Sequence, residues 1–201
     1  KAAYNIANYA EFEDGIIGYM SNTNAVIMGN YCEGNNRLSF SFGTTDMDAT
    51  SIGNVATKGK GTAFAFGAKR MTSLGDVSKN GKSTANDTVI SGDYVTLHGF
   101  KVVNPDDLLN GVFISGDYCR IYGGHILMNK LASRLNRGLV LGTMSGSSPT
   151  NAIIDGVNIE SCKAGIVADA SVINCRVKNH FLINNTTDVS DLSNGGLIIE
   201  S

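Results

Sequence analysis

A repeat of 24 residues runs through the sequence, and it limits the possible folds more than any other feature. Residues 90–94 read ISGDY, and the same five letters return at residues 114–118. Upstream, residues 40–43, FSFG, return with the same spacing as residues 64–67, FAFG. Matching positions continue to Val177 without a linker. A fixed period in the range of roughly 20–50 residues is typical of a solenoid, in which each unit buries its apolar side against its neighbours.

Within each unit, apolar residues alternate over short stretches. This alternation predicts strands with one buried side, and the Gly and Asn residues between them predict tight turns. A unit this short with two or three strands cannot be a helical repeat, and the LxxLxLxxN pattern of leucine-rich repeats is missing. We therefore predict an all-β fold, a parallel β-helix of about 22–27 residues per coil, with coils roughly 4.8 Å apart. The alternating pairs are Phe40/Phe42, Phe64/Phe66, Val95/Leu97, Val112/Ile114 and Cys119/Ile121.

A parallel β-helix predicts which residues meet in space, because aligned positions lie one above the other. Tyr94 should lie beside Tyr118, and Ile90 beside Ile114. A glycine or asparagine recurs three residues before an aliphatic residue, as expected for corners that need a positive φ angle. The predicted corner residues are Gly99, Gly123, Gly156 and Asn174.

Composition excludes several classes of protein. Hydrophobic residues make up 42% of the 201 residues, so the chain can form a sizeable core and is not expected to be disordered. The net charge of −2 leaves no basic surface for nucleic acid and no polybasic patch for a membrane surface. No apolar run approaches the roughly 18 residues of a transmembrane helix, and Lys1 does not begin a signal peptide, so we expect no membrane insertion.

We predict a single β-helix domain over residues 1–201. Residues 1–37 would form atypical first coils that cap the stack, residues 38–180 the regular coils, and residues 181–201 a terminal coil. Residues 1–13 also fit a short helix. The chain begins abruptly and ends in the strand-like run LIIES, so we expect a fragment or a processed product.

The cysteines show no spacing typical of a metal site. Cys119 takes the place of Val95 in the preceding unit, and Cys175 that of Val157, so we predict buried free thiols rather than disulfides or metal ligands. Reduced cysteines indicate a reducing site of synthesis. We expect no metal and no cofactor. The cysteines are Cys32, Cys119, Cys162 and Cys175.

Three longer inserts interrupt the boundaries between units, and inserts in a solenoid form loops on one flank, often the binding flank. Leu127, Leu131 and Leu135 have helical spacing, so the second insert predicts a short helix. The inserts are residues 104–110, 129–136 and 143–151.

The coil patterns resemble the right-handed parallel β-helices of the pectate-lyase-like superfamily, and among them the trimeric tailspikes and tail appendages of bacteriophages. The residues that carry the resemblance read ISGDYVTLHGFKV, ISGDYCRIYGGHI and AIIDGVNIES, and coils of this kind cover about two thirds of the chain. The narrower likeness to phage proteins rests on Gly-, Asn-, Ser- and Thr-rich coils, on reduced cysteines and on the final Ser201, because some phage appendages are cut after a serine.

The resemblance implies a homotrimer that binds, and often cleaves, bacterial surface polysaccharide. It implies a place in the virion tail after synthesis in the host cytoplasm, with secretion as the alternative. Two other functions fit the repeat as well. One is a free-standing polysaccharide lyase, hydrolase or epimerase, and the other is a structural shaft or adhesin without a ligand.

Cleavage by hydrolysis would need two carboxyl groups roughly 5–9.5 Å apart in a groove. Asp93 and Asp117 would stack on adjacent coils and meet this distance loosely, although an Asp after a Gly is also a common turn residue. Asp155 lies in a strand pattern and can point outward. Asp106 and Asp107 lie in a loop, where they also fit an ordinary turn. Asp93, Asp117 and Asp155 are the candidate catalytic residues.

Cleavage by a lyase would need a basic side chain and a positive group to neutralise a uronate. His98 falls on the coil next to Arg120, Tyr122 and His125, and these four are the best such set, although surface roles fit them too. The carboxylate clusters of calcium-dependent pectate lyases are missing. Sugars also stack on aromatic rings, so we predict that substrate contacts come from Tyr94, Tyr118, Arg120, Tyr122, His125, Arg134 and Arg137.

Overall fold

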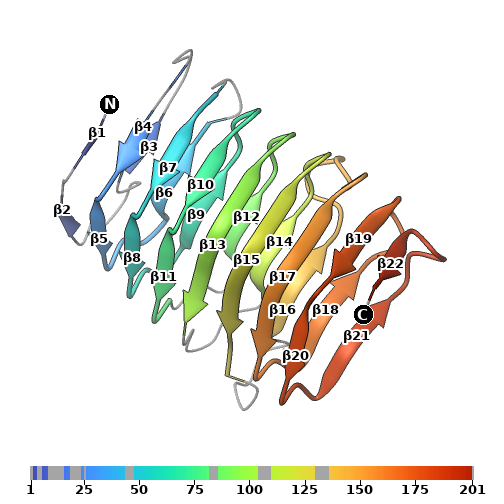
Figure 1. Ribbon diagram of the computed structural model, residues 1–201. Helices are drawn as coiled ribbons and strands as arrows, with labels where there is room; N and C mark the ends of the chain where they lie inside the picture. Colours follow the sequence, from blue (N-terminus) through green and yellow to red (C-terminus); the bar gives the residue numbers. More distant parts are fainter. Residues whose placement is uncertain are drawn as a thin grey trace.

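The chain folds into a parallel β-helix, in which successive coils lie side by side along one axis (Figure 1). This computed structural model describes residues 2–3, 6–8, 16–18, 24, 26–43, 48–81, 86–103, 110–129 and 136–200. In this part of the chain all pairs of named strands are parallel, and there is no helix. The predicted all-β parallel β-helix is confirmed.

Each coil has three sides, which we call faces 1, 2 and 3. Faces 1 and 2 belong to one sheet of 14 strands, because β13 (Thr96–Val103), β15 (Arg120–Leu127) and β17 (Ile153–Glu160) run through both. Face 3 is a separate sheet of eight strands, one from each of eight successive coils.

Face 1 also contains β1 (Ala2–Ala3), β4 (Val26–Met28), β7 (Thr50–Ile52), β10 (Thr72–Leu74), β19 (Cys175–Lys178) and β22 (Leu197–Ile199). Face 2 also contains β2 (Ile6–Asn8), β5 (Tyr31–Glu33), β8 (Val55–Thr57), β11 (Val77–Lys79) and β20 (Phe181–Ile183). Face 3 consists of β3 (Ile16–Gly18), β6 (Leu38–Phe42), β9 (Thr62–Phe66), β12 (Asn86–Ile90), β14 (Asn110–Ile114), β16 (Arg137–Leu141), β18 (Ala164–Ala168) and β21 (Thr187–Asp191).

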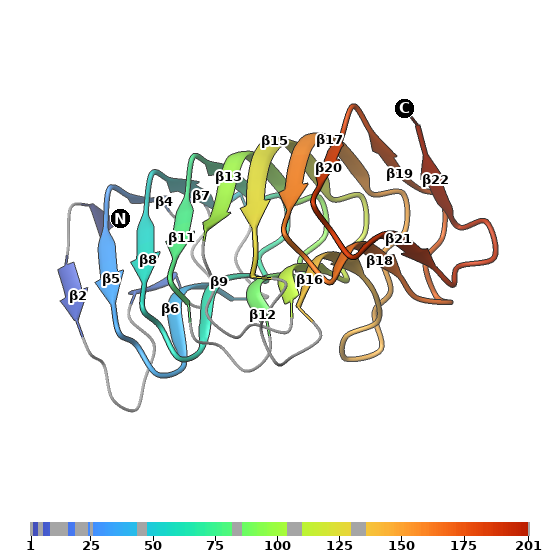
Figure 2. The same ribbon diagram turned by 90° about the horizontal axis from the view of Figure 1, so that it is seen from below.

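Successive coils pair in the register that the repeat predicts. Thr50, Thr72 and Thr96 pair in turn across face 1, and Ile90 pairs with Ile114 on face 3. Figure 2 shows the strands β5, β8 and β11 of three such coils side by side. Coil lengths run from 22 to 27 residues, with one exception. On face 1, 33 residues separate Arg120 from Ile153, and this stretch includes both residues 129–136 and residues 143–151.

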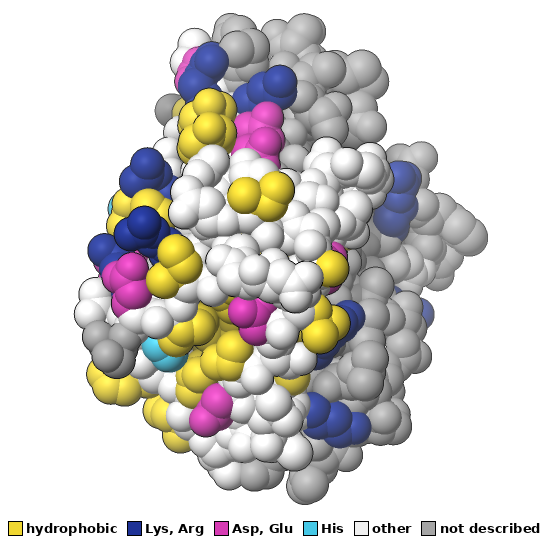
Figure 3. Space-filling view, turned by 90° about the vertical axis from the view of Figure 1, so that its right-hand side faces the viewer, with side chains coloured by type: hydrophobic (Ala, Val, Ile, Leu, Met, Phe, Trp, Pro, Cys, Tyr) yellow, Lys and Arg dark blue, Asp and Glu magenta, His cyan; other side chains and the backbone are white. Residues whose placement is uncertain are grey.

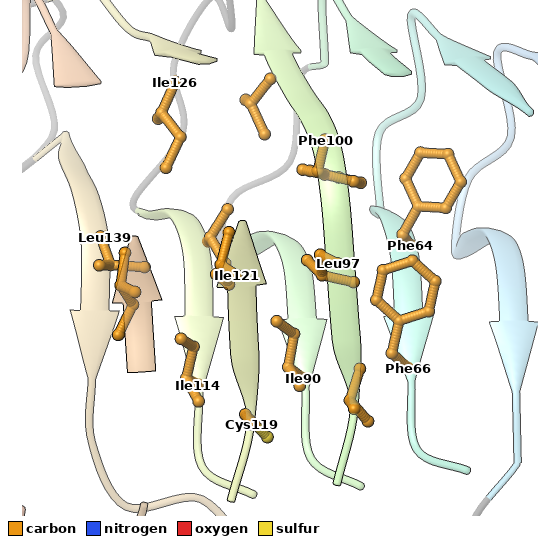
Figure 4. Close-up of a cluster of buried hydrophobic side chains, with 14 of the residues drawn as sticks. Phe64, Phe66, Ile90, Leu97, Phe100, Ile114, Cys119, Ile121, Ile126 and Leu139 are labelled. Carbon is orange, nitrogen blue, oxygen red and sulfur yellow. The ribbon is translucent and has the colours of Figure 1, made fainter. Parts of the chain in front are cut away.

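Side chains that point inward fill the space between the three faces. Phe40 and Phe64 stack with their ring centroids 5.0 Å apart. Phe66, Ile90 and Ile114 form a second column of buried side chains (Figure 4). Burying one such side chain contributes roughly 1.5–3 kcal/mol to folding, so the stacking of like on like is a main source of stability.

Glycines turn the chain at the corner between faces 1 and 2. Gly99, Gly123 and Gly156 have φ angles of 62°, 62° and 72°, which confirms three of the predicted corner positions. Asn174 also has a positive φ angle, 50°, as predicted, but it lies in the corner between faces 3 and 1 and not in this column. Strands β17 and β19 pair with a spacing of 23 residues, so Asn179, with a φ angle of 47°, follows Gly156 here.

The sequence predicted a short helix near residue 130 that includes Leu127. The structure contradicts this at Leu127, which is the last residue of strand β15. Leu131 and Leu135 lie outside the described residues.

All four cysteines are buried free thiols, as predicted. Burial raises the pKa of Cys32, Cys119 and Cys162 to about 12, so these thiols stay protonated and unreactive. One predicted equivalence is wrong, because Cys175 is level with Ala152 and not with Val157.

A ladder of buried polar side chains bridges the coils inside the corner between faces 1 and 2. Asn54 Oδ1 accepts hydrogen bonds from the backbone and side-chain N–H groups of Asn30, at 3.0 and 2.9 Å. Asp76 Oδ1 accepts the same two bonds from Asn54, at 2.8 and 3.1 Å. Burial raises the pKa of Asp76, although its hydrogen bonds oppose this shift. The ladder satisfies corner N–H groups that no neighbouring strand can reach.

A second buried carboxyl group connects face 2 to face 3. The hydroxyl of Ser78 donates to Asp87 Oδ2 at 2.6 Å, and the hydroxyl of Thr88 donates to Oδ1 at 3.1 Å. Burial raises the pKa of Asp87 from its ordinary 3.8 to about 6, because two neutral donors do not replace the lost hydration of the charge.

The C-terminal end of the stack exposes apolar side chains. Figure 3 looks onto this end, where yellow apolar groups lie in its centre. Phe181, Ile183 and Leu192 are 63%, 45% and 64% exposed. Among the described residues, the last strands β20, β21 and β22 are paired along one edge only.

We predict that Gly123→Val lowers the free energy of unfolding by about 1–3 kcal/mol, because a branched residue is strained at a φ angle of 62°. A Cβ atom there meets nothing within 4 Å, so a steric clash makes no contribution. Gly123→Asn is the control and should be nearly neutral, because Asn179 occupies the same column. Urea unfolding measures both, and equal stability of the Val variant and the parent would disprove strain at this corner.

We predict that Asp87→Asn raises stability at pH 7 and removes part of its pH dependence. The folded pKa of about 6 lies above the ordinary 3.8, so the folded state holds a proton that the unfolded state has already lost. The contribution of Asp87 is therefore complete below about pH 4 and is lost as the pH rises through about 6. Urea unfolding at pH 4, 5, 6 and 7 tests this, and identical pH profiles of variant and parent would contradict it.

Candidate functional site

A column of residues with positive φ angles forms the corner between faces 3 and 1, and we call it the tyrosine corner. Tyr94 and Tyr118 lie in its middle, with φ angles of 59° and 55°. Bulky residues rarely adopt this conformation. Asn, which tolerates it far better, fills three other positions of the column. The column consists of Asn24, Asp48, Arg70, Tyr94, Tyr118, Asn151 and Asn174.

The aspartates before these tyrosines hold the corner in place. The backbone N–H of Asp117 donates to Asp93 Oδ1 at 3.1 Å. Asp117 Oδ1 in turn accepts hydrogen bonds from the backbone and the hydroxyl of Thr150, at 3.0 and 2.8 Å. Each carboxylate thus binds the next coil, so Asp93 and Asp117 have a structural task in the turn.

The two tyrosine side chains are exposed and stacked. Their rings lie 5.0 Å apart with an interplanar angle of 3°, which confirms that Tyr94 lies beside Tyr118. Tyr94 is 54% exposed and Tyr118 is 42% exposed. A positive φ angle costs a non-glycine residue about 1–3 kcal/mol, and such strain at an exposed position points to a role outside the core.

A second stack lies next to the first one on face 1. The rings of His98 and Tyr122 are 5.2 Å apart with an interplanar angle of 23°. Arg120 points outward between Tyr118 and Tyr122 on the same coil, and its Nη1 donates to the Tyr122 hydroxyl at 3.3 Å. Tyr94 and His98 come from one coil, and the other three residues from the next. We call these five residues the aromatic band.

Charged and polar residues border the aromatic band toward the N-terminal end of the stack. Arg70, level with Tyr94 in the tyrosine corner, binds both carboxylate oxygens of Asp48, at 2.8 and 2.9 Å. This hydrogen bonding holds the pKa of Asp48 below its ordinary value. Leu74 pairs with His98 and is exposed.

The border toward the C-terminal end contains Asp155, the third candidate catalytic residue. It pairs with Tyr122 across the strands β15 and β17. Its Oδ1 accepts a hydrogen bond from Asn179 at 2.8 Å, and its Oδ2 lies 3.2 Å from Lys178 Nζ. The bond from Asn179 and then the bond and charge of Lys178 lower the pKa of Asp155, whereas a general acid needs a raised pKa.

The loop 143–151 enters the tyrosine corner next to Tyr118. The backbone N–H of Tyr118 donates to the carbonyl of Thr150 at 2.8 Å. At the other end of the loop, the hydroxyl of Thr143 lies 2.9 Å from that of Ser148 and 2.6 Å from that of Ser171. The loop is therefore anchored at the tyrosine corner by Thr150 and at its other end by a set of hydroxyl groups.

The other predicted substrate contacts lie elsewhere or outside the described residues. His125 lies on face 2, because the corner at Gly123 separates it from Tyr122, and its Nε2 is 3.4 Å from Glu160 Oε2. Arg137 lies on face 3 and donates to Asn110 Oδ1 at 2.7 Å, and burial lowers its pKa. Arg134, Asp106 and Asp107 are outside the described residues.

The sequence prediction assigned none of the five other residues of the tyrosine corner to it; these are Asn24, Asp48, Arg70, Asn151 and Asn174. Arg70 and Asp48 precede Tyr94 by one and two coils, so extending the repeat backwards would have found them. Asn151 follows Tyr118 only after the 33-residue coil, and this longer spacing conceals both Asn151 and Asn174. The amide of Asn174 donates to that of Asn151 at 2.6 Å.

The chemistry of the aromatic band suits binding better than bond cleavage. Asp93 and Asp117 are occupied by backbone and hydroxyl donors, and Asp155 by a lysine and an amide. Within the described ranges no three His, Cys, Asp or Glu side chains gather in a way that could hold a metal ion. What the band offers is a set of aromatic rings, hydroxyl groups, amides and one guanidinium.

Comparison with known proteins places the chain in a family. Residues 22–197, which include nearly all the coils, match the family described as "Protein of unknown function (DUF1565)". A comparison with curated proteins gave no match. Among the residues that the structure describes, no helix is long and apolar enough to cross a membrane. The match covers more than half of the sequence, and the chain therefore belongs to the DUF1565 family.

Proposed function

We propose that this β-helix binds bacterial surface polysaccharide through the aromatic band. The observation that carries the proposal is the exposed stack of Tyr94 and Tyr118 in a strained backbone conformation. The fold itself does not need these rings, because Asn fills the same position at Asn24, Asn151 and Asn174. Strained residues that persist on a surface are concentrated at binding sites.

The chemistry of the band fits a carbohydrate. A pyranose ring has apolar C–H faces, which pack on aromatic rings, and hydroxyl groups around its edge. The outer faces of the tyrosine stack border Arg70 on one side and Asn151 on the other. Guanidinium and amide groups donate several hydrogen bonds each. A glycan that runs along the solenoid axis would therefore contact rings in the middle and polar groups at both ends.

The hydrogen bonds of the candidate catalytic carboxylates favour binding of the polysaccharide without its cleavage. The three candidate catalytic residues all have partners in the protein, and the pKa of Asp155 is lowered. A hydrolase would need one carboxyl group with a raised pKa beside the substrate. Among the described residues, the two carboxyl groups with raised pKa values are Asp76 and Asp87, and both are buried in the interior.

The biological setting follows from the resemblance to phage tailspikes and tail appendages. We propose a homotrimer in the virion tail, made in the host cytoplasm, that attaches to the bacterial surface. A secreted protein with the same binding surface is the alternative. Repeated weak contacts along three copies would strengthen attachment to a repeating polymer.

The double variant Tyr94→Asn/Tyr118→Asn tests glycan binding. We expect it to fold as stably as the parent, because Asn occupies this column elsewhere. Its dissociation constant for a bound polysaccharide should rise at least about tenfold, because loss of central aromatic contacts typically costs on the order of 2 kcal/mol or more. A panel of capsular polysaccharides and O-antigens, measured by biolayer interferometry, provides the test. Lys101→Gln on face 2 is the control and should bind as the parent does. Binding that is unchanged in the double variant, or no binding across the panel, would refute the proposal.

The mass in solution tests the assembly. A homotrimer should have a mass near three times the 21.2 kDa of one chain in light scattering at micromolar concentration. A monomer under these conditions would refute the tailspike-like assembly while leaving the binding test unaffected.

A further inference from the structure

Cationic side chains on face 1 differ in whether a carboxylate neutralises them. The strands of face 1 carry three described cations, Arg120, Arg176 and Lys178. Lys178 Nζ lies 3.2 Å from Asp155 Oδ2, and Arg176 Nη1 lies 3.6 Å from Glu200 Oε1. Two of the three charges are therefore compensated.

Arg120 is the exception. It is exposed, and among the described residues its side-chain partner is the neutral hydroxyl of Tyr122, at 3.3 Å. No described carboxylate comes within ion-pair distance of it. Of its five N–H donors, one serves Tyr122, and the side chain is exposed to solvent.

Arg120 and the Tyr122 hydroxyl place two hydrogen-bond donors next to each other. The Tyr122 hydroxyl accepts a hydrogen bond from Arg120, so its own hydrogen is free to donate in a neighbouring direction. A guanidinium binds a carboxylate with two parallel N–H bonds, and this geometry is stronger and more selective than a single bond. The carboxylate of Asp155, whose strand position pairs with Tyr122, is held by Lys178 and Asn179 and does not bind Arg120.

We infer that Arg120 binds the carboxylate of an acidic sugar, so that the aromatic band selects glycans that contain uronic acid residues. The inference rests on the proposed function. The tyrosine stack supplies contacts that any pyranose can use, and Arg120 supplies preference for the acid. A sulfate ester also offers two oxygen atoms that a guanidinium can bind with parallel N–H bonds, so sulfated polymers form a separate arm of the test.

The test compares polymers that differ only at the carboxyl group. Hyaluronan, alginate and polygalacturonate are each measured beside their carboxyl-reduced forms, with chondroitin sulfate and dextran sulfate as the sulfated arm. The proteins are the parent, Arg120→Gln, the tyrosine double variant and Arg176→Gln. Arg176 lies in the same outward row as Arg120 two coils away, so its variant is a control of the same residue type and charge.

We expect the parent to bind at least one uronate polymer ten or more times more tightly than its reduced form. Arg120→Gln should remove this preference and leave the weaker binding of the reduced form, while Arg176→Gln keeps the preference. Equal binding of both forms, or a preference that survives in Arg120→Gln, overturns the inference. Arg120-dependent binding of sulfated polymers alone also overturns it. If binding is tyrosine-dependent but indifferent to the carboxyl group, only this inference fails. If no polysaccharide in either panel binds, the proposed function fails with it.

Discussion

The parallel hydrogen bonding of each coil to the next is the interaction on which this structure depends. Because the strands pair in register, a strand residue within the stack has a fixed neighbour about one strand spacing away on each side. Inside, this register stacks Phe40 on Phe64 and places Asn30, Asn54 and Asp76 in one hydrogen-bonded ladder. Outside, the same register places Tyr94 on Tyr118 and His98 on Tyr122. The same strand pairing therefore positions the side chains of both the core and the candidate site.

The corners explain how such a regular structure can present a distinct surface. At the corner between faces 1 and 2, glycine relieves the strain of a positive φ angle. At the tyrosine corner, two bulky residues accept this strain, and the carboxylates of Asp93 and Asp117 hold the backbone in place across neighbouring coils. The hydrogen bonds that stabilise the turn therefore also keep the rings at the surface. This arrangement gives the carboxylates next to the aromatic band a structural task in the turn.

Sequence periodicity was enough to predict the architecture, because each unit repeats the same strand and turn signals. It also predicted the contact between Tyr94 and Tyr118, since the coils that carry them have equal length. The prediction failed after Gly156. It placed Asn174 and Cys175 18 residues after their supposed partners Gly156 and Val157, whereas the structure pairs β17 and β19 with a spacing of 23 residues. Asn occurs at both residue 174 and residue 179, and the local pattern does not show which of the two follows Gly156 in its column.

Predicting the candidate site was harder, because neighbours in sequence can lie on different faces. Tyr122 and His125 are three residues apart, yet the turn at Gly123 places them on faces 1 and 2. Conversely, Arg70 and Asn151 lie far apart in sequence but border the same tyrosine stack. Sequence patterns also could not show that Arg120 lacks an acidic partner, since ion pairs depend on side-chain positions across three coils.

The loop 143–151 leaves and re-enters the stack between two coils that are already paired, and Thr150 ties its end to Asp117. Lengthening a loop whose ends are anchored in this way changes the entropy of closure only slowly with its length. The segment beside the tyrosine corner can therefore vary in size and composition during evolution while the rungs on either side stay as they are. A change in this loop would then alter the surface next to the tyrosine corner without any change in the coils.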